Sequence, residues 1–149
     1  MDPIQRQEQA NNFLEGGIFY PTGHVVIGLP DSTSVDKATQ ALKNAGFEDQ
    51  HLLGIDANTM VREATKNLAA ANLSAGSALP TRQKQLELAE EGCHFLVIYA
   101  PEDADHERAI MALSGLPVRY AVKYRRLVIE NLVENIRSNT ADSEPARVP

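Results

Sequence analysis

Residues 24–42 read HVVIGLPDSTSVDKATQAL, and residues 94–113 read HFLVIYAPEDADHERAIMAL. Each stretch opens with an apolar run that a proline ends, which is typical of a buried strand. An acidic residue follows the proline, and alanine and leucine then recur at spacings of three and four, which predicts an amphipathic helix. The two stretches therefore predict two strand–helix units of the same design.

Individual positions of the two units correspond when Pro30 is aligned with Pro101. Asp31 then falls on Glu102, and the two histidines that open the strands match after a one-residue shift. The helices share an acid–base pair and the pattern Ala-x-x-Ala-Leu, at residues 36–42 and 107–113. We therefore expect the two halves of the chain to be structurally similar.

Further strands are expected at residues 50–56 and 118–129, which complete two β-α-β halves. Such halves, each with a right-handed crossover, fold naturally into a four-stranded, mainly antiparallel sheet with helices on one face. The sequence thus predicts an α+β fold, a ferredoxin-like β-α-β repeat plait. Residues 58–91 read as an inserted helical pair, and the apolar strand VVIGL favours some cover on the second face of the sheet.

The length of 149 residues suits one domain, which we expect over residues 13–136, with 58–91 as the helical insertion. Residues 1–12 and 137–149 are polar, and we expect flexible N-terminal and C-terminal tails there. Residues 127–137 either continue the last strand briefly or form a short helix.

The net charge of −6 argues against a nucleic-acid partner, because such proteins usually present a basic face. A single cysteine cannot form an internal disulfide, and the polar N-terminus lacks the apolar core of a signal peptide. No apolar run approaches the roughly 20 residues that span a bilayer. We therefore expect a cytoplasmic protein without nucleic-acid or membrane partners.

Tyrosines and basic residues alternate along the expected last strand, residues 120–126. A period of two places Tyr120, Val122, Tyr124 and Arg126 on one face, and Ala121, Lys123 and Arg125 on the other. Such tyrosines can stack on RNA bases, but the RNA-recognition signature is missing. A half-exposed strand, or a sheet edge used in dimerisation, is the favoured interpretation.

Cys93 and His94 are neighbours on a strand and therefore point to opposite faces, so they cannot form a thiol–imidazole pair. One cysteine also gives no Cys-x-x-Cys scaffold for a metal. His106 lies among acidic residues in the first turns of a helix, where the acids match the helix dipole. We assign no catalytic residues, no metal and no cofactor.

Two strand-to-helix turns, at residues 30–34 and 101–106, place helix N-termini where a small anion could bind. A pocket between subunits near Gly23-His24 and these turns is the candidate site for a nucleotide or another anionic ligand. Its candidate residues are His24, Asp31, Ser32, Ser34, Glu102, Asp103 and His106.

Residues 92–101 (GCHFLVIYAP), His106 to Leu113 and Ala121 to Leu132 together resemble small bacterial stress-induced proteins of the general stress protein 17M type. Residues 25–47 resemble them more loosely. Many relatives carry a glycine-rich hydrophobic hairpin between the halves, where this chain has the helical segment 58–91. The resemblance implies a bacterial, cytoplasmic, stress-related α/β protein and supplies no catalytic residues.

We therefore predict a non-enzymatic stress-related or regulatory protein that acts through oligomerisation or protein interaction. Because open plaits leave sheet edges that a second copy often covers, we expect a homodimer or higher symmetric oligomer. The first alternative is the small-molecule sensor described above. The second is an enzyme that uses His94 or His106 with nearby carboxylates.

Overall fold

The computed structural model describes residues 14–15, 18–71, 76, 78–126 and 128–143. Its centre is a five-stranded sheet in the order β4-β5-β3-β6-β7, in which every neighbouring pair is antiparallel. The strands are β3 (His24–Leu29), β4 (Leu52–Ile55), β5 (His94–Tyr99), β6 (Tyr120–Tyr124) and β7 (Ile129–Asn131). A separate small sheet pairs β1 (Leu14–Glu15) with β2 (Ile18–Phe19). The predicted α+β class and mainly antiparallel sheet are confirmed.

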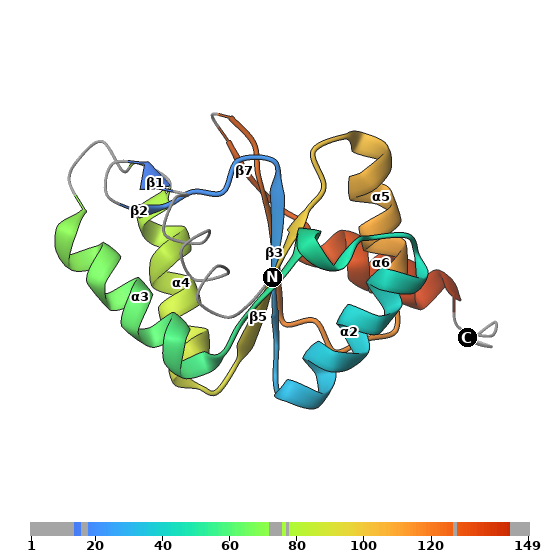
Figure 1. Ribbon diagram of the computed structural model, residues 1–149, viewed down its shortest axis with the longest axis horizontal. Coiled ribbons are helices and arrows are strands. Elements are labelled where there is room, and N and C mark those ends of the chain that lie inside the picture. The colour runs from blue at the N-terminus through green and yellow to red at the C-terminus, as the bar shows by residue number, and fades with distance from the viewer. Residues whose placement is uncertain (1–13, 16–17, 72–75, 77, 127, 144–149) are drawn as a thin grey trace.

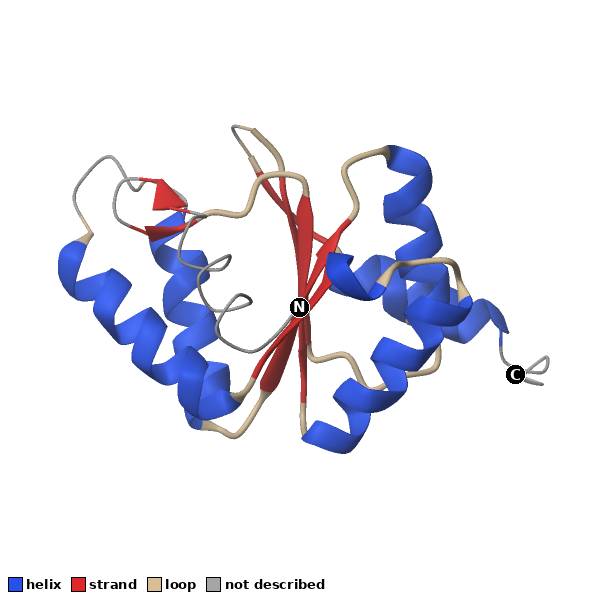
Figure 2. Cartoon of the chain, in the orientation of Figure 1, coloured by secondary structure: helices blue, strands red, loops and turns tan. Residues whose placement is uncertain are grey.

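Helices cover both faces of the five-stranded sheet (Figures 1 and 2). On one face lie α2 (Ser32–Asn44), α5 (Asp103–Ala112) and α6 (Val133–Ser143). On the other face lie α3 (Ala57–Ala70) and α4 (Ala78–Glu90), the helical pair expected within residues 58–91. A 3-10 turn, Asp49–His51, leads into β4. The inserted helices therefore provide the cover that the apolar strand VVIGL requires.

Strand β3 shows why two covered faces produce a continuous apolar run. Val25 and Ile27 belong to the core beneath α2, α5 and α6, whereas Val26 belongs to the core beneath α3 and α4. Gly28 allows close packing between strands, because a Cβ atom there would lie 3.0 Å from Phe95 Cε1 and 3.1 Å from Tyr120 Cβ. We call the side of the sheet that α2, α5 and α6 cover the first face. The side that α3 and α4 cover is the second face.

The sheet has five strands rather than the predicted four, because the strand expected at residues 118–129 ends at Tyr124. The chain then turns, closed by a 2.8 Å hydrogen bond from Arg125 N to Val128 O, and returns as β7 beside β6. Asn131 Oδ1 accepts from Val133 N at 3.0 Å and starts helix α6. That helix includes residues 137–143, which were expected to belong to a flexible tail, while residues 1–12 and 144–149 lie outside the described ranges.

The alternation predicted for β6 is confirmed, but the half-exposed character is wrong. The side chains of Tyr120, Val122 and Tyr124 belong to the core on the second face of the sheet, and that of Ala121 belongs to the core on the first face. All five residues of β6 are buried, because α4 contacts the two tyrosines and α6 packs against the strand on the first face. In the described part of the chain, no helix is long and apolar enough to cross a membrane.

Candidate functional site

The seven candidate ligand-binding residues divide into two groups at opposite ends of β3. The antiparallel register of β3 and β5 pairs His24 with Tyr99 and Leu29 with His94. The six-residue strand separates these ends by roughly 17–20 Å. Asp31, Ser32 and Ser34 follow the Leu29 end, whereas His24, Glu102, Asp103 and His106 lie at the other. One chain therefore does not bring the two turns into a shared site.

At the Leu29 end, protein groups already occupy the helix N-termini. The Asp31 carboxylate accepts a 2.7 Å hydrogen bond from Ser34 N, and this bond lowers the pKa of Asp31. Asp56 caps α3 in the same way, and His94 Nδ1 accepts from Ala57 N at 3.3 Å. Carboxylates thus stand where an anion would bind, and His94 serves as a second cap.

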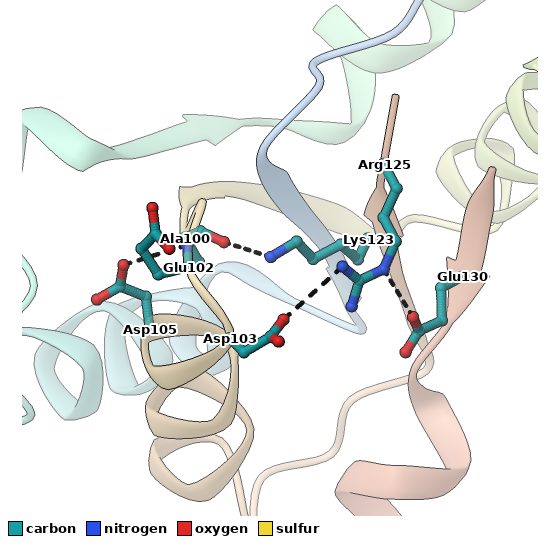
Figure 3. A network of polar contacts seen from close by, with 7 residues as sticks. All are labelled: Ala100, Glu102, Asp103, Asp105, Lys123, Arg125 and Glu130. Atoms are coloured by element: carbon teal, nitrogen blue, oxygen red, sulfur yellow. Dashed lines mark hydrogen bonds and ion pairs between the residues drawn. The ribbon is translucent and has the colours of Figure 1, made fainter. Parts of the chain in front are cut away.

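Figure 3 shows the polar contacts at the opposite end, where β6 meets the start of α5. Lys123 is only 2% exposed, and its Nζ donates to Ala100 O. Arg125 lies beside it and bridges Asp103, at 3.8 Å, and Glu130, at 2.9 Å. We call this group, together with His106, the lysine cluster: Ala100, Asp103, His106, Lys123, Arg125 and Glu130.

Lys123 is a buried cation without a close counterion. Burial lowers the pKa of Lys123, as does the positive charge of Arg125, while the carboxylates of Asp103 and Glu130 raise it. These carboxylates form their salt bridges with Arg125, and within the described ranges no carboxylate lies within 4.0 Å of Lys123 Nζ. The ammonium group is therefore hydrogen-bonded to a single neutral carbonyl.

His106 is 7% exposed, and its Nδ1 is a buried atom without a hydrogen-bond partner in the described structure. Burial, and next the positive charge of Lys123, lower the pKa of His106, so the ring is neutral at pH 7. His24, at the same end of the sheet, places Nδ1 3.1 Å from Thr22 O, and burial lowers its pKa as well. This end therefore combines a buried cation with two neutral imidazoles.

A second buried cation, Arg82, lies on the second face and was not predicted from the sequence. Its side chain is 3% exposed, and Nε donates to Asn67 Oδ1 at 3.0 Å. Nη1 lies 2.8 Å from Gln85 Oε1 and 3.1 Å from Met60 Sδ, and the guanidinium stacks 4.8 Å from the centre of the Phe19 ring. Burial lowers the pKa of Arg82 to about 10, which leaves it charged at pH 7.

Gln85 connects Arg82 to the two tyrosines of β6. Its Nε2 donates to Tyr120 Oη at 3.0 Å and to Tyr124 Oη at 2.8 Å. Burial raises the pKa of Tyr124 to about 12 and that of Tyr120 well above its ordinary value. We call this group the arginine network: Met60, Asn67, Arg82, Gln85, Tyr120 and Tyr124.

The sequence did contain a signal for the arginine network. Ala78, Arg82, Gln85 and Ala89 recur at spacings of four, three and four, which is the period of one buried helix face, and all four are buried. Two polar residues interrupt that stripe, so hydrophobicity alone does not reveal it.

Cys93 is fully buried in the second-face core, and burial raises the pKa of its thiol. Its Sγ accepts from Arg119 Nη1 at 3.6 Å. Among the described residues, no group of three or more histidine, cysteine, aspartate or glutamate side chains is placed to hold a metal ion. No family model matches the chain, and searches of curated proteins and of solved structures found no significant similarity.

Proposed function

We propose that the protein is a non-enzymatic interaction protein that acts as a symmetric homodimer joined through the edge strand β4. The observation that carries the proposal is the direction of the β4 backbone groups. Ala100 N donates to Gly23 O in the β3–β5 register, so alternate residues of β5 bond to β3. The residues between them, Phe95 and Val97, then bond to β4.

In β4, the partners of Phe95 and Val97 are Ile55 and Leu53, so these two residues direct their N–H and C=O groups inward. The groups of Leu52 and Gly54 consequently point outward, away from β5. Gly54 is exposed, and a Cβ atom there would meet nothing within 4 Å. Strand β4 carries neither lysine nor proline, the residues that usually protect an edge from pairing.

A two-fold axis beside Leu53 would pair β4 with its copy as antiparallel neighbours. Leu52 of each copy would then lie opposite Gly54 of the other, and the outward N–H and C=O groups of both would be satisfied. The opposite edge of the sheet suits this arrangement less well, because β7 has three residues and includes the charged Glu130. A symmetric dimer therefore uses the edge that lacks protection.

Light scattering after size-exclusion chromatography tests this proposal. We expect the wild-type chain to have twice the monomer mass and Gly54→Pro to be a monomer, because proline removes an outward donor without disturbing the β4–β5 pairing. Gly54→Ala, the matched control, retains the N–H and remains dimeric. A monomeric wild type, or a Gly54→Pro variant that stays dimeric, contradicts the proposal.

We also propose that the sheet is a ferredoxin-like plait with β7 added at one edge. Taken in chain order, β3, β4, β5 and β6 are the first to fourth strands, and their spatial order is second, third, first, fourth. That order, with a helix after β3 and another after β5, is what two β-α-β halves produce. The bacterial, cytoplasmic and stress-related character is part of the proposal and rests on the sequence resemblance alone; stress sensitivity of a deletion strain tests it.

The alternatives have less support from the geometry. An anion sensor built from both strand-to-helix turns would need groups that lie at opposite ends of β3, and at one end the Asp31 carboxylate already caps α2. An enzyme based on His94 would need a ring nitrogen that instead accepts from Ala57 N. The self-association through β4 requires no rearrangement of the chain.

A further inference from the structure

Lys123 has hydrogen-bonding capacity that the protein does not use. An ammonium group carries three N–H donors, and Lys123 Nζ has one acceptor, Ala100 O, among the described residues. The side chain is 98% buried, since only 2% of its surface is exposed. Buried charges are normally paired or fully hydrogen-bonded, because the loss of hydration costs several kcal/mol. Lys123 Nζ therefore retains N–H donors that can bind a further acceptor.

His106 gives a second, independent indication at the same position. Its side chain is 7% exposed, and Nδ1 has no hydrogen-bond partner in the described part of the chain. Asp103 and His106 are three residues apart in α5 and therefore lie on the same side of that helix, and Asp103 Oδ1 lies 3.8 Å from Arg125 Nη1. The His106 ring therefore lies on the side of α5 that faces the lysine cluster. Because roughly 90% or more of buried polar groups have a partner, two adjacent groups with unused capacity indicate a binding site.

The unused groups define the chemistry of the missing partner. Lys123 requires an acceptor, and a neutral His106 with its proton on Nδ1 can donate to the same atom, so the partner presents oxygen. A negative oxygen also supplies the counterion that Lys123 lacks, because Asp103 and Glu130 are held by Arg125. Glu102 and Asp105 already form a capping box at the start of α5, so the missing partner contacts the side chains of Lys123 and His106 and not the helix N–H groups. The neighbouring carboxylates limit the ligand to a low charge.

We propose that Lys123 and His106 bind one oxyanion group, a carboxylate or phosphate of a small acid, beside the first turn of α5. The site is separate from the β4 edge and does not depend on the proposed homodimer.

Thermal unfolding in sodium acetate or sodium phosphate, with sodium chloride used to hold the ionic strength constant, tests this proposal. We expect a saturable rise in the wild-type Tm of about 3–6 °C at ten times Kd for at least one of these anions. Lys123→Met removes the response. Lys37→Met, which deletes an exposed lysine of α2, retains it and controls for the change in net charge.

The two anions distinguish the sources of the oxyanion: a Lys123-dependent rise in acetate assigns a carboxylate, and one in phosphate assigns a phosphate. A second measurement uses the wild-type chain alone, in case Lys123→Met folds poorly. The imidazole nitrogens of His106, observed by NMR, should shift along the same saturation curve as the Tm. If neither anion moves the His106 signals, or if both anions raise the Tm of Lys123→Met as much as that of the wild type, the proposal is overturned.

Discussion

Among the described residues, each face of the sheet buries one cation, and the contacts of these two cations differ. Arg82 on the second face is 3% exposed, and Lys123 on the first face is 2% exposed. Arg82 is surrounded by acceptors on Asn67 and Gln85 and by an aromatic ring, whereas Lys123 has one carbonyl acceptor. Burial of a charge is therefore not what marks a binding site. The distinguishing property is hydrogen-bonding capacity that the protein leaves unused.

The chemistry of the two side chains fits this difference. A guanidinium is planar and weakly hydrated, so neutral acceptors and a ring face can replace its water. A compact ammonium is more strongly hydrated and loses more when it is buried with a single acceptor. We therefore interpret the arginine network as structural. We interpret the lysine cluster as a site that a ligand completes.

The largest expected effect comes from breaking the arginine network at Gln85. Gln85→Leu leaves Arg82 Nη1 without its oxygen acceptor and removes the donor to both tyrosine hydroxyls. We expect a loss of about 3–5 kcal/mol in the free energy of unfolding, measured by urea denaturation. Gln83→Leu, an exposed neighbour on the same helix, should change stability by less than about 0.5 kcal/mol. Equal losses in the two variants would show that the network contributes no stability.

The second-largest effect is expected at alkaline pH, where ionisation of Tyr124 lowers the free energy of unfolding. Burial raises the pKa of Tyr124 from 10.0 to about 12, so the unfolded chain loses this proton first as the pH rises. Tyr124 therefore adds up to about 2–3 kcal/mol of stability that is complete below pH 10 and is lost between about pH 10 and 12.

The measurement compares Tyr124→Phe with the wild type by urea denaturation between pH 8 and pH 11. The variant is needed for comparison because burial also lowers the pKa of Arg82 to about 10. Loss of the Arg82 proton at high pH raises the stability of both proteins, which opposes the effect of Tyr124. The stability of the wild type should fall more steeply with pH than that of the variant. Parallel pH profiles would show that Tyr124 ionises normally in the folded state.

A smaller effect is expected for Lys123→Met without an added anion. The change removes an unpaired buried cation but also leaves Ala100 O without its donor, and these contributions oppose each other. We expect the free energy of unfolding to stay within about 1 kcal/mol of the wild type, in contrast to Gln85→Leu. A loss as large as that of Gln85→Leu would make Lys123 structural and remove the distinction between the two cations.

The smallest effect is expected for Arg125→Gln. This arginine is about two-fifths exposed, and its partners Asp103 and Glu130 are 88% and 39% exposed. Exposed ion pairs contribute little, so the stability should change by no more than about 1 kcal/mol, measured by urea denaturation. A larger loss would show that Arg125 supports the packing around Lys123 rather than only neutralising its neighbours.

Much of the fold could be predicted from the sequence, because both halves combine an apolar strand with an amphipathic helix. The side-chain alternation of β6 was also predictable, since a period of two places Tyr124 and Lys123 on opposite faces. The burial of both residues was not, because it depends on how α4 and α6 pack on the two faces of the sheet, which a local sequence pattern does not reveal. Strand β7 was missed because no glycine or proline marks the turn at residues 125–128.

The candidate site was predicted only in part. His106 and Asp103 do belong to one cluster, but Asp31, Ser32 and Ser34 lie at the other end of β3. This separation follows from the antiparallel pairing of β3 with β5, which local motifs do not reveal. Arg82 and Lys123 were missed because a charged residue in a sequence is usually exposed, and only the contacts of the folded chain identify the exceptions.

Strand β7 has a consequence for the size of any assembly. A sheet with two unprotected edges can add copies at both sides and grow without limit, as fibrils do. Here the edge beyond β6 is β7, which has three residues, includes Glu130 and ends in the turn to α6, so among the described strands β4 is the less protected edge. Pairing of β4 with its own copy uses that edge in both molecules. In the proposed homodimer, three residues at one side of the sheet would thus limit each chain to one pairing edge, and growth would stop at two chains.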